Sequence, residues 1–266
     1  MSAMNVSGFI DRYFIKQPRI REAMTRVIYG RSDAVVLLFD RSFSINRLKE
    51  NGYLRAANRA LHTSLFRDEA VILQRLPLFC EDDMTFVDVG ANIGIFSACM
   101  ASVSQVRRNF NVMAFEVHPD TFSRLQKNAQ RHGFEAFNTA IAAEAQTMTF
   151  VEGAVSHVTT ATTHSNSYNI ASRTFEVEAR RLDSFEFGGS ILLKIDVEGQ
   201  ELAVLEGASK LFDEGRVRAV YIDGYGDIGV LDFLRDRGFE LRDCRTLEKV
   251  EGDVFSLLAL KVLRTN

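Results

Sequence analysis

The fold is decided by the stretch Phe86-Val87-Asp88-Val89-Gly90-Ala91-Asn92-Ile93-Gly94, in which an apolar run leads into a turn with two glycines. An apolar run of this length is typical of a strand that is buried on both faces of a sheet. Glycines after such a strand let a ligand approach the backbone, and the helix expected over Ile93–Val103 would offer free N–H groups where it begins. The stretch therefore predicts the first strand, turn and helix of a nucleotide-binding α/β domain.

Apolar runs and amphipathic stretches alternate through the rest of the chain, which is the pattern of a mostly parallel sheet covered by helices. The seven expected strands are Thr85–Val89, Val112–Val117, Ala136–Ile141, Ile191–Ile195, Ala219–Asp223, Phe239–Asp243 and Val254–Val262. The other expected helices are Thr121–Arg131, Gln200–Phe212 and Ile228–Arg237. We therefore expect an α/β fold with a seven-stranded, mostly parallel sheet and helices on both faces.

Two regions break this alternation. Thr147–Val151 and Thr174–Arg180 indicate extended segments that enclose a polar loop from Ser156 to Ser167. The N-terminal region combines a basic amphipathic stretch (Asp11–Val27), a hairpin (Ala34–Phe39 with Ser42–Leu48) and a helix (Arg67–Leu76). We predict an α+β extension over residues 1–80, in the position of a substrate cover, and a ligand-binding domain over residues 81–266.

The bulk composition excludes several classes of protein. A formal net charge of -3 over 266 residues gives no general attraction to nucleic acid, so we expect none as partner. No window reaches the ~18 uncharged apolar residues of a membrane span, and no secretion signal is visible, so we expect a cytoplasmic protein. The five histidines show no metal-ligand spacing, so no metal site is predicted. Cys80, Cys99 and Cys244 lie far apart and are expected to be free and buried.

The turn after the first strand indicates the kind of ligand. Gly90 and Gly94 are four residues apart and do not match the G-x-G-x-x-G spacing that dinucleotides need, which disfavours NAD. Asp88 would repel a phosphate but suits a ligand with an ammonium group and hydroxyls, as in S-adenosylmethionine. Glu116 follows Gly94 by 22 residues, at the tip of the second strand, where a carboxylate can accept both ribose hydroxyls. The alternatives are a simple strand-to-helix turn and a solvent-facing glutamate.

A third acidic segment follows the fourth strand. Asp196 and Glu198 flank Val197, so an extended backbone would place both carboxylates on one side at the carboxyl edge of the sheet. There they could take a proton from a substrate hydroxyl, face a cationic sulfonium or hold a metal. Alternatively, Glu198 caps the next helix and Asp196 bonds to backbone N–H groups of the loop.

Three segments together resemble the FkbM family of methyltransferases. They are Asp88 to Gly94, Glu116-Val117-His118-Pro119, and Leu193 to Gly199 with Val204-Leu205-Glu206-Gly207-Ala208. The resemblance implies a Rossmann-like class I methyltransferase fold that transfers a methyl group from S-adenosylmethionine, usually to a hydroxyl of a sugar, polyketide or other small metabolite. It also implies that Gly90, Ala91 and Asn92 bind the cofactor and that Asn138 and Ala140 lie near its adenine.

The remaining candidates concern the acceptor. The fifth strand ends in Tyr221-Ile222-Asp223, where the family typically carries a glutamate, so Asp223 is expected in place of that carboxylate. We expect Asp196 to be the general base, and His118 and His157 are substrate candidates whose alternatives are solvated loop residues. The rival functions are a NAD-dependent enzyme and a module that binds S-adenosylmethionine without catalysis. A homo-oligomer is compatible with the sequence.

Overall fold

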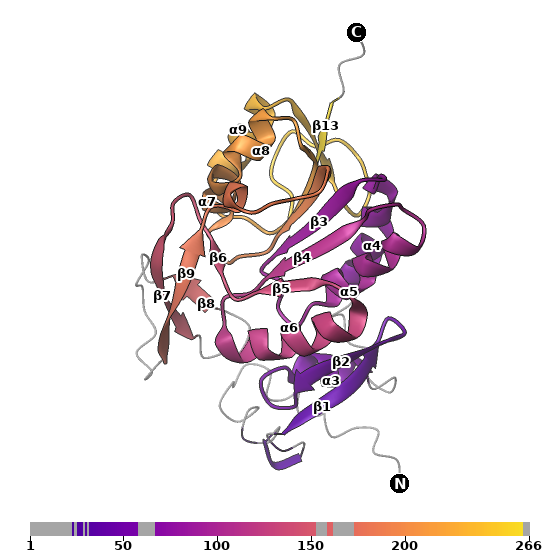
Figure 1. Ribbon diagram of the computed structural model, residues 1–266, viewed down its shortest axis with the longest axis vertical. Helices are drawn as coiled ribbons and strands as arrows, with labels where there is room; N and C mark the ends of the chain where they lie inside the picture. Colours follow the sequence, from indigo (N-terminus) through magenta and orange to yellow (C-terminus); the bar gives the residue numbers. More distant parts are fainter. Residues whose placement is uncertain are drawn as a thin grey trace.

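The central element of the computed structural model is a seven-stranded sheet (Figure 1). The structure describes residues 32–57, 67–152, 159–161 and 173–262, with isolated residues between 23 and 30. The sheet has the order β12-β13-β11-β10-β3-β4-β5, and β13 runs antiparallel to both of its neighbours, β11 and β12, whereas the other neighbouring pairs are parallel. The strands are β3 (Met84–Val89), β4 (Asn111–Phe115), β5 (Glu135–Phe137), β10 (Ser190–Ile195), β11 (Val217–Asp223), β12 (Phe239–Asp243) and β13 (Ser256–Lys261). The predicted sheet is confirmed. After β3 the chain continues toward one edge of the sheet (β4), and after β10 it continues toward the other edge (β11). The carboxyl ends of β3 and β10 therefore form the topological switch point, where open α/β sheets bind their ligands.

Helices cover both faces of this sheet. One face packs against α7 (Glu201–Gly207), α8 (Ser209–Asp213) and α9 (Gly229–Asp236), and the other against α4 (Arg67–Arg75), α5 (Ile95–Ala101) and α6 (Pro119–His132). Each face of the sheet has its own hydrophobic core, and successive residues of one strand point alternately into the two cores. Val87 and Leu193 lie in the core beneath α7, α8 and α9, and Phe86 and Leu192 lie in the core on the opposite face. Short 3-10 helices follow α4 (η2, Leu76–Phe79), α5 (η3, Ser102–Gln105) and precede β10 (η5, Leu182–Ser184).

The helix expected over Gln200–Phe212 is wrong in its continuity, because it divides into α7 and α8 at Ala208. The cause lies at Gly207, where an added Cβ would meet the Ala142 carbonyl oxygen at 2.2 Å. The helix passes so close to the neighbouring backbone that only glycine fits, and glycine weakens the helical turn that it ends.

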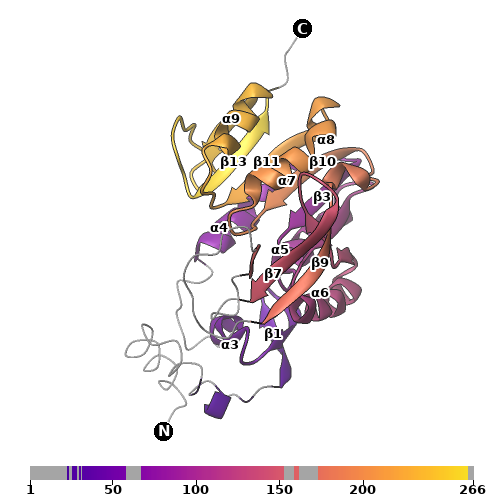
Figure 2. The same cartoon turned by 90° about the vertical axis from the view of Figure 1, so that its left-hand side faces the viewer.

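The strand expected over Ala136–Ile141 is also divided. Its first part is β5, and its second part, β6 (Ala140–Ile141), belongs to a separate four-stranded sheet with the order β6-β9-β7-β8. The other strands of this second sheet are β7 (Gln146–Glu152), β8 (Thr159–Ala161) and β9 (Thr174–Arg180), and β7 and β9 lie toward the viewer in Figure 2. Asn138 fixes the break, because its amide nitrogen donates to the carbonyl oxygens of Glu116 (2.8 Å) and Val117 (3.1 Å). The two predicted extended segments are confirmed, whereas residues 159–161 of the predicted loop are a strand.

The predicted N-terminal hairpin is confirmed as β1 (Asp33–Leu38) and β2 (Arg41–Asn46), followed by α3 (Asn51–Ala57). The connecting residues Phe39 and Asp40 both have positive φ, 49° and 57°, as the type I′ form of a two-residue hairpin turn requires. Figure 1 shows the hairpin on the side of α6 that faces away from the main sheet. The basic stretch predicted over Asp11–Val27 lies almost wholly outside the described residues.

A buried ion pair attaches this extension to α6. The Arg124 guanidinium contacts the Glu50 carboxylate, and the two side chains are only 6% and 1% exposed. Beside them, the Asn128 side chain accepts from the Ser44 backbone N–H (2.7 Å) and donates to the Ile93 carbonyl (2.8 Å). The hairpin is therefore linked through α6 to the turn that follows β3.

Two further expectations concern the chain as a whole. The three cysteines are free, and Cys80 and Cys244 are buried as predicted, whereas Cys99 is half-buried. In the described part of the chain, no helix combines the length and the apolar character needed to cross a membrane.

Candidate functional site

The turn between β3 and α5 brings two parallel strands together at the switch point. Gly90 has φ +78°, and an added Cβ would lie 1.9 Å from the backbone oxygen of Asp196. Gly94, with φ +86°, is the N-cap residue directly before α5, and a Cβ there would lie 2.6 Å from Leu125 of α6. The backbone conformation favours glycine at both positions, and the approach to backbone atoms of Asp196 adds a steric requirement at Gly90.

A pocket opens directly beside this turn. Its polar lining includes Gly90, Asn92, Glu116, Asp196 and Glu198. Its apolar lining comes from the tip of β4 and from the second sheet, namely Phe115, Ala140, Ile141, Met148 and Phe150. A lining that combines acidic and polar groups with apolar side chains suits a ligand that has both a sugar and a flat heterocycle.

Glu116 is held rigidly at the edge of the pocket. Its two carboxylate oxygens accept from the backbone N–H groups of Asn92 (2.9 Å) and His118 (2.8 Å). Burial raises the pKa of this carboxyl to about 7, against the two backbone hydrogen bonds, and the nearby Asp196 adds to the rise. With 9% of its surface exposed, Glu116 can still use its remaining lone pairs toward a ligand.

Asp88 lies beneath the pocket, with a fully buried side chain. One carboxylate oxygen accepts from the Ser97 hydroxyl (2.6 Å) and the other from the Lys194 ammonium (2.8 Å). Asp88 therefore connects β3, β10 and α5.

Lys194 is a member of the site that the sequence analysis did not single out. Its ammonium lies 2.8 Å from Asp88 and 3.7 Å from Asp196, and the pKa is raised to about 12, because these carboxylates and Asp223 outweigh the opposing effect of burial. A lysine within the otherwise apolar run Ile191–Ile195 is a signal that could have identified it, because a buried cation needs partners.

Asp196 lies on the pocket side of this lysine. Partial withdrawal from water inside the pocket raises its pKa to about 6, Lys194 opposes the rise, and Asp223 on the adjacent strand contributes to it. The side chain keeps 41% of its surface exposed, so a ligand in the pocket can reach it. Asp223 in turn accepts from the Tyr221 hydroxyl at 2.9 Å.

Glu198 lines the pocket, but its backbone conformation differs from the extended one that was expected. The backbone is not extended here, because Glu198 has φ +32° in the turn before α7. The carboxylate that bonds to the backbone before α7 belongs to Glu201, which accepts from the Gly199 N–H at 2.8 Å. Burial raises the pKa of Glu198, with Glu201 and Asp223 as further causes.

The other candidates are placed as follows. His118 accepts from the Thr121 N–H (3.4 Å) at the beginning of α6 and packs edge-on against Phe175 at 5.1 Å. Asn138 is exposed and braces the break after β5, while its neighbour Thr139 and the predicted Ala140 line the pocket. His157 lies outside the described residues. Met148 and Phe150, which sequence reasoning missed, reach the pocket only because β7 folds back onto β9.

Comparison with known proteins identifies the family. The sequence pattern of the protein family described as "Methyltransferase FkbM domain" matches residues 88–241, which are more than half of the chain. The chain is 30% identical over 146 residues to the hexuronic acid methyltransferase AglP of Haloferax volcanii, covering 53% of this chain and 56% of that protein. It is 26% identical over 173 residues to Methyltransferase 1 of Beauveria bassiana, covering 55% and 66%. The matched part thus spans between half and two thirds of these relatives.

The solved structures with a similar fold include the FkbM methyltransferase of Methylobacillus flagellatus, at 17% identity and a TM-score of 0.47, covering 70% of this chain and 46% of that one. The family match extends from Asp88 in β3 to Leu241 in β12. It thus includes the Gly90 turn, the pocket beside it and the acidic segment after β10. On that match, the chain belongs to the FkbM methyltransferase domain family.

Proposed function

We propose that the protein is an enzyme that transfers the methyl group of S-adenosylmethionine to a hydroxyl oxygen of a sugar or another small metabolite. The observation that carries this proposal is the meeting of Glu116, Asp196 and Glu198 in one pocket beside the Gly90 turn. The family and the relative named as a hexuronic acid methyltransferase support a methyl transfer and a sugar acceptor.

The residues of the pocket fit this cofactor. Glu116 has lone pairs for both ribose hydroxyls, and its position is fixed by two backbone N–H groups. Phe115, Met148 and Phe150 offer apolar surface of the kind that an adenine ring packs on. Asp88 is proposed to hold the turn through Ser97 and Lys194, in place of the direct contact with the ligand that its sequence position suggested.

The chain's own groups would supply a base for the reaction. Bound S-adenosylmethionine supplies an electrophilic methyl group on a sulfonium. Asp196 would accept the proton of the acceptor hydroxyl, and a pKa of about 6 leaves it mostly ionised at neutral pH while making it a stronger base than an aspartate in bulk water. Lys194 would hold Asp196 in position, and the pocket walls would orient the two reactants.

The N-terminal extension is proposed to border the acceptor side. Tyr53 of α3 packs against the apolar cluster that contains Ile93 and Ile95, in and after the Gly90 turn. Burial and the negative charges of Asp196, Glu50 and Glu116 raise the pKa of its phenol. A segment in that position can limit access of water and select the acceptor.

Isothermal titration of the full chain with S-adenosylmethionine, S-adenosylhomocysteine and NAD tests the proposal. We expect micromolar binding of the two sulfur compounds and loss of about tenfold or more in Glu116→Ala, because a charged hydrogen-bond acceptor is removed. Glu81→Ala, an exposed glutamate outside the pocket, is the matched control. Preference for NAD, or no binding of either sulfur compound, would refute the proposal, whereas binding without methyl transfer to any hydroxyl compound would favour a non-catalytic module.

A further inference from the structure

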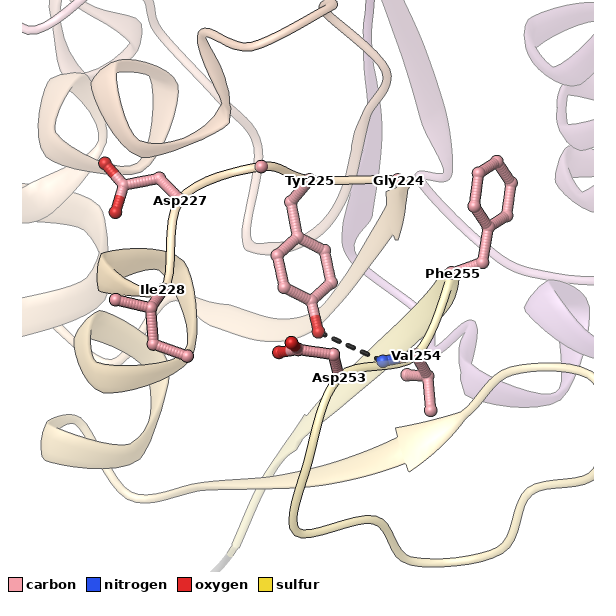
Figure 3. Close-up of a pocket in the computed structure, with 8 residues that line it drawn as sticks. Gly224, Tyr225, Asp227, Ile228, Asp253, Val254 and Phe255 are labelled. Atoms are coloured by element: carbon pink, nitrogen blue, oxygen red, sulfur yellow. Dashed lines mark hydrogen bonds between the residues drawn. The ribbon is translucent and has the colours of Figure 1, made fainter.

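Exposed apolar side chains gather in the N-terminal extension. Among the described residues, ten large apolar side chains are exposed, and five of them belong to residues 27–39: Val27, Ile28, Val35, Leu37 and Phe39. Figure 3 shows two of the other five, Phe255 and Ile228, which point away from each other on different sides of Tyr225. Apolar surface that gathers in one region marks an interaction site, whereas single exposed residues need no partner.

β1 is apolar on both of its faces, but only one of them is covered. Val36 and Leu38 belong to the apolar cluster that also contains Ile93, and α3 packs against the same cluster. By the alternation of a strand, Val35 and Leu37 point to the opposite side, where they are 61% and 57% exposed. A continuous apolar run is typical of a strand that is covered on both faces. The outer face of β1, formed by Val35 and Leu37, therefore has the composition of a buried surface.

Cationic side chains border this outer face. It lies opposite Ser44 and Ser42 of β2, and the Arg131 guanidinium donates to the Ser44 hydroxyl (3.2 Å) and the Ser42 carbonyl (3.3 Å). These acceptors are uncharged, so they leave the positive charge of Arg131 in place. The aspartate at the beginning of the same strand, Asp33, is paired with Lys127 at 3.3 Å. The border of the outer face is therefore positive.

The extension as a whole is also positive. Residues 1–80 contain thirteen lysines and arginines against seven aspartates and glutamates, which gives a formal net charge of +6. Residues 81–266 contain 19 against 28, which gives -9. Such an asymmetry within one chain indicates an anionic partner for the basic end. It also opposes the pairing of two extensions from two copies of the chain, because like charges would meet.

The sequence before β1 combines this charge with apolar residues at helical spacing. The apolar residues, at positions i, i+4, i+7 and i+8, are Ile20, Met24, Val27 and Ile28, and the basic residues beside them are Arg19, Arg21 and Arg26. Where the structure describes the end of this stretch, residues 26–28 are helical and Val27 is 85% exposed. A basic amphipathic helix of this kind is typical of segments that lie in the surface of a membrane.

We infer that the N-terminal extension docks on the surface of a lipid bilayer that contains anionic lipids. The outer face of β1, together with Val27 and Ile28, contacts the acyl chains, and the basic residues lie near the headgroups. Apolar side chains gain free energy when they leave water, and each cation near an anionic surface adds an attraction. A nucleic acid would satisfy the cations but would leave the valine and leucine side chains in water. This docking does not depend on the proposed methyl transfer.

Co-sedimentation of the full chain with lipid vesicles tests the docking. Vesicles of phosphatidylcholine alone are compared with vesicles of equal parts phosphatidylcholine and phosphatidylglycerol, at low and at physiological salt. We expect partitioning to be about tenfold or more stronger on the anionic vesicles and to weaken as salt is added, because salt screens the charges at the surface.

One double variant tests the apolar contact. Val35→Thr with Leu37→Thr is expected to weaken partitioning on anionic vesicles about tenfold, because apolar surface no longer enters the acyl region. Threonine is a good strand former, so the hairpin should be retained. Leu78→Thr with Val106→Thr changes two exposed apolar side chains outside the outer face and should have no effect.

A second double variant tests the charge. Arg19→Gln with Arg21→Gln should weaken partitioning on anionic vesicles about tenfold and leave partitioning on neutral vesicles unchanged. Arg107→Gln with Arg108→Gln, which removes two exposed arginines outside the extension, is the matched control. Circular dichroism and thermal unfolding check that each variant folds.

The docking is refuted by equal partitioning on neutral and anionic vesicles, by no partitioning at all, or by partitioning that Val35→Thr with Leu37→Thr leaves unchanged. Other partners would give different results. In sedimentation velocity without vesicles, a dimer that Val35→Thr with Leu37→Thr dissociates would assign the outer face to a second copy of the chain. Tighter binding to an RNA of mixed sequence than to anionic vesicles would assign the basic residues to nucleic acid.

Discussion

Asp88 and Asp196 end neighbouring parallel strands and share one lysine, but their surroundings differ. Asp88 is the next-to-last residue of β3, is fully buried and contacts both Ser97 and Lys194. Asp196 is the first residue after β10, lies 3.7 Å from Lys194 and keeps 41% of its side chain exposed. Asp196 lies two positions further along its strand than Asp88 does. Asp88 therefore links β3, β10 and α5, whereas Asp196 faces the pocket.

The position of an acidic residue relative to the end of its strand decides whether it packs inside the fold or reaches a ligand pocket. Both carboxylates come from stretches that resemble segments of the FkbM family, yet only the one beyond the end of its strand lines the pocket. Within a strand, a side chain points into the packing of one face, whereas beyond the last strand residue it can turn toward the carboxyl edge. The pairing of Lys194 with Asp88 in register places the ammonium under both groups.

The largest expected effect comes from removal of the shared lysine. Lys194→Met should lower the free energy of unfolding by about 3–5 kcal/mol, because it leaves Asp88 buried without its cation. Chemical denaturation measures this loss, with Lys210→Met, an exposed lysine in an i,i+4 pair, as control. Adding Asp88→Asn to Lys194→Met should restore part of the stability, and a loss equal to the sum of the two single effects would show that the pair is not coupled.

The second prediction separates the two aspartates by function. Asp196→Asn should reduce kcat about 100-fold while it changes the affinity for S-adenosylmethionine by less than about threefold, because it removes a base and keeps the shape. Turnover assays and calorimetry on the same preparation measure both quantities, and Asp213→Asn, on an exposed aspartate, is the control. An unaltered kcat would remove Asp196 from the mechanism and make it a second structural carboxylate.

The third prediction concerns the contact that sets the distance between the two strand ends. Gly90→Ala should destabilise the fold by about 2 kcal/mol more than Gly133→Ala and should weaken cofactor binding. Both glycines have similar positive φ, +78° and +75°, but only the Cβ at position 90 would meet backbone atoms, at 1.9 Å. Thermal and chemical denaturation compare the two variants, and equal losses would mean that the close approach to Asp196 adds nothing beyond the backbone conformation.

The smallest expected effect sharpens the comparison with a third carboxylate. Glu116 is nearly as buried as Asp88, but its donors are backbone N–H groups rather than a lysine, and its pKa is raised to about 7. If the ionised form binds the ribose hydroxyls, the affinity for S-adenosylmethionine should rise about tenfold between pH 6 and pH 8. Calorimetry across this range measures the rise.

The same shift has the opposite consequence for stability. A carboxyl whose pKa is higher in the folded state stabilises the fold most below pH 4.5, and this contribution is lost as the pH rises through about 7.

Glu116→Gln is the control for the binding prediction. The pH dependence of S-adenosylmethionine binding should disappear in this variant, and its persistence would assign the titration to another group.

The sequence was sufficient for the order of elements and for part of the pocket beside the Gly90 turn, whose lining includes Gly90, Asn92, Glu116 and Ala140 but not Asp88, Ala91, Gly94 or Asn138. Periodicity placed all seven strands of the main sheet, and the position of Glu116 at the end of the second strand led to a residue that lines the pocket. These features are local, because a strand, its turn and its helix are contiguous along the chain.

What could not be predicted depends on contacts between distant segments. The break at Asn138 requires hydrogen bonds to the backbone after β4, and the approach of Met148 and Phe150 requires a second sheet that no local pattern announces. The pairing of Lys194 with Asp88 bridges 106 positions along the chain. The ionisation of Asp196 and Glu116 depends on burial, which the sequence does not contain.

The early departure of the chain from the main sheet has a consequence for self-association. β5 stands at one edge of that sheet with three residues, since the chain leaves at Asn138 to enter the second sheet. A strand this short exposes few unpaired N–H and C=O groups, so it is a poor template for a strand of another molecule. The break at Asn138, which directs the chain into the sheet that forms one wall of the pocket, therefore also disfavours edge-to-edge pairing with a strand of another molecule.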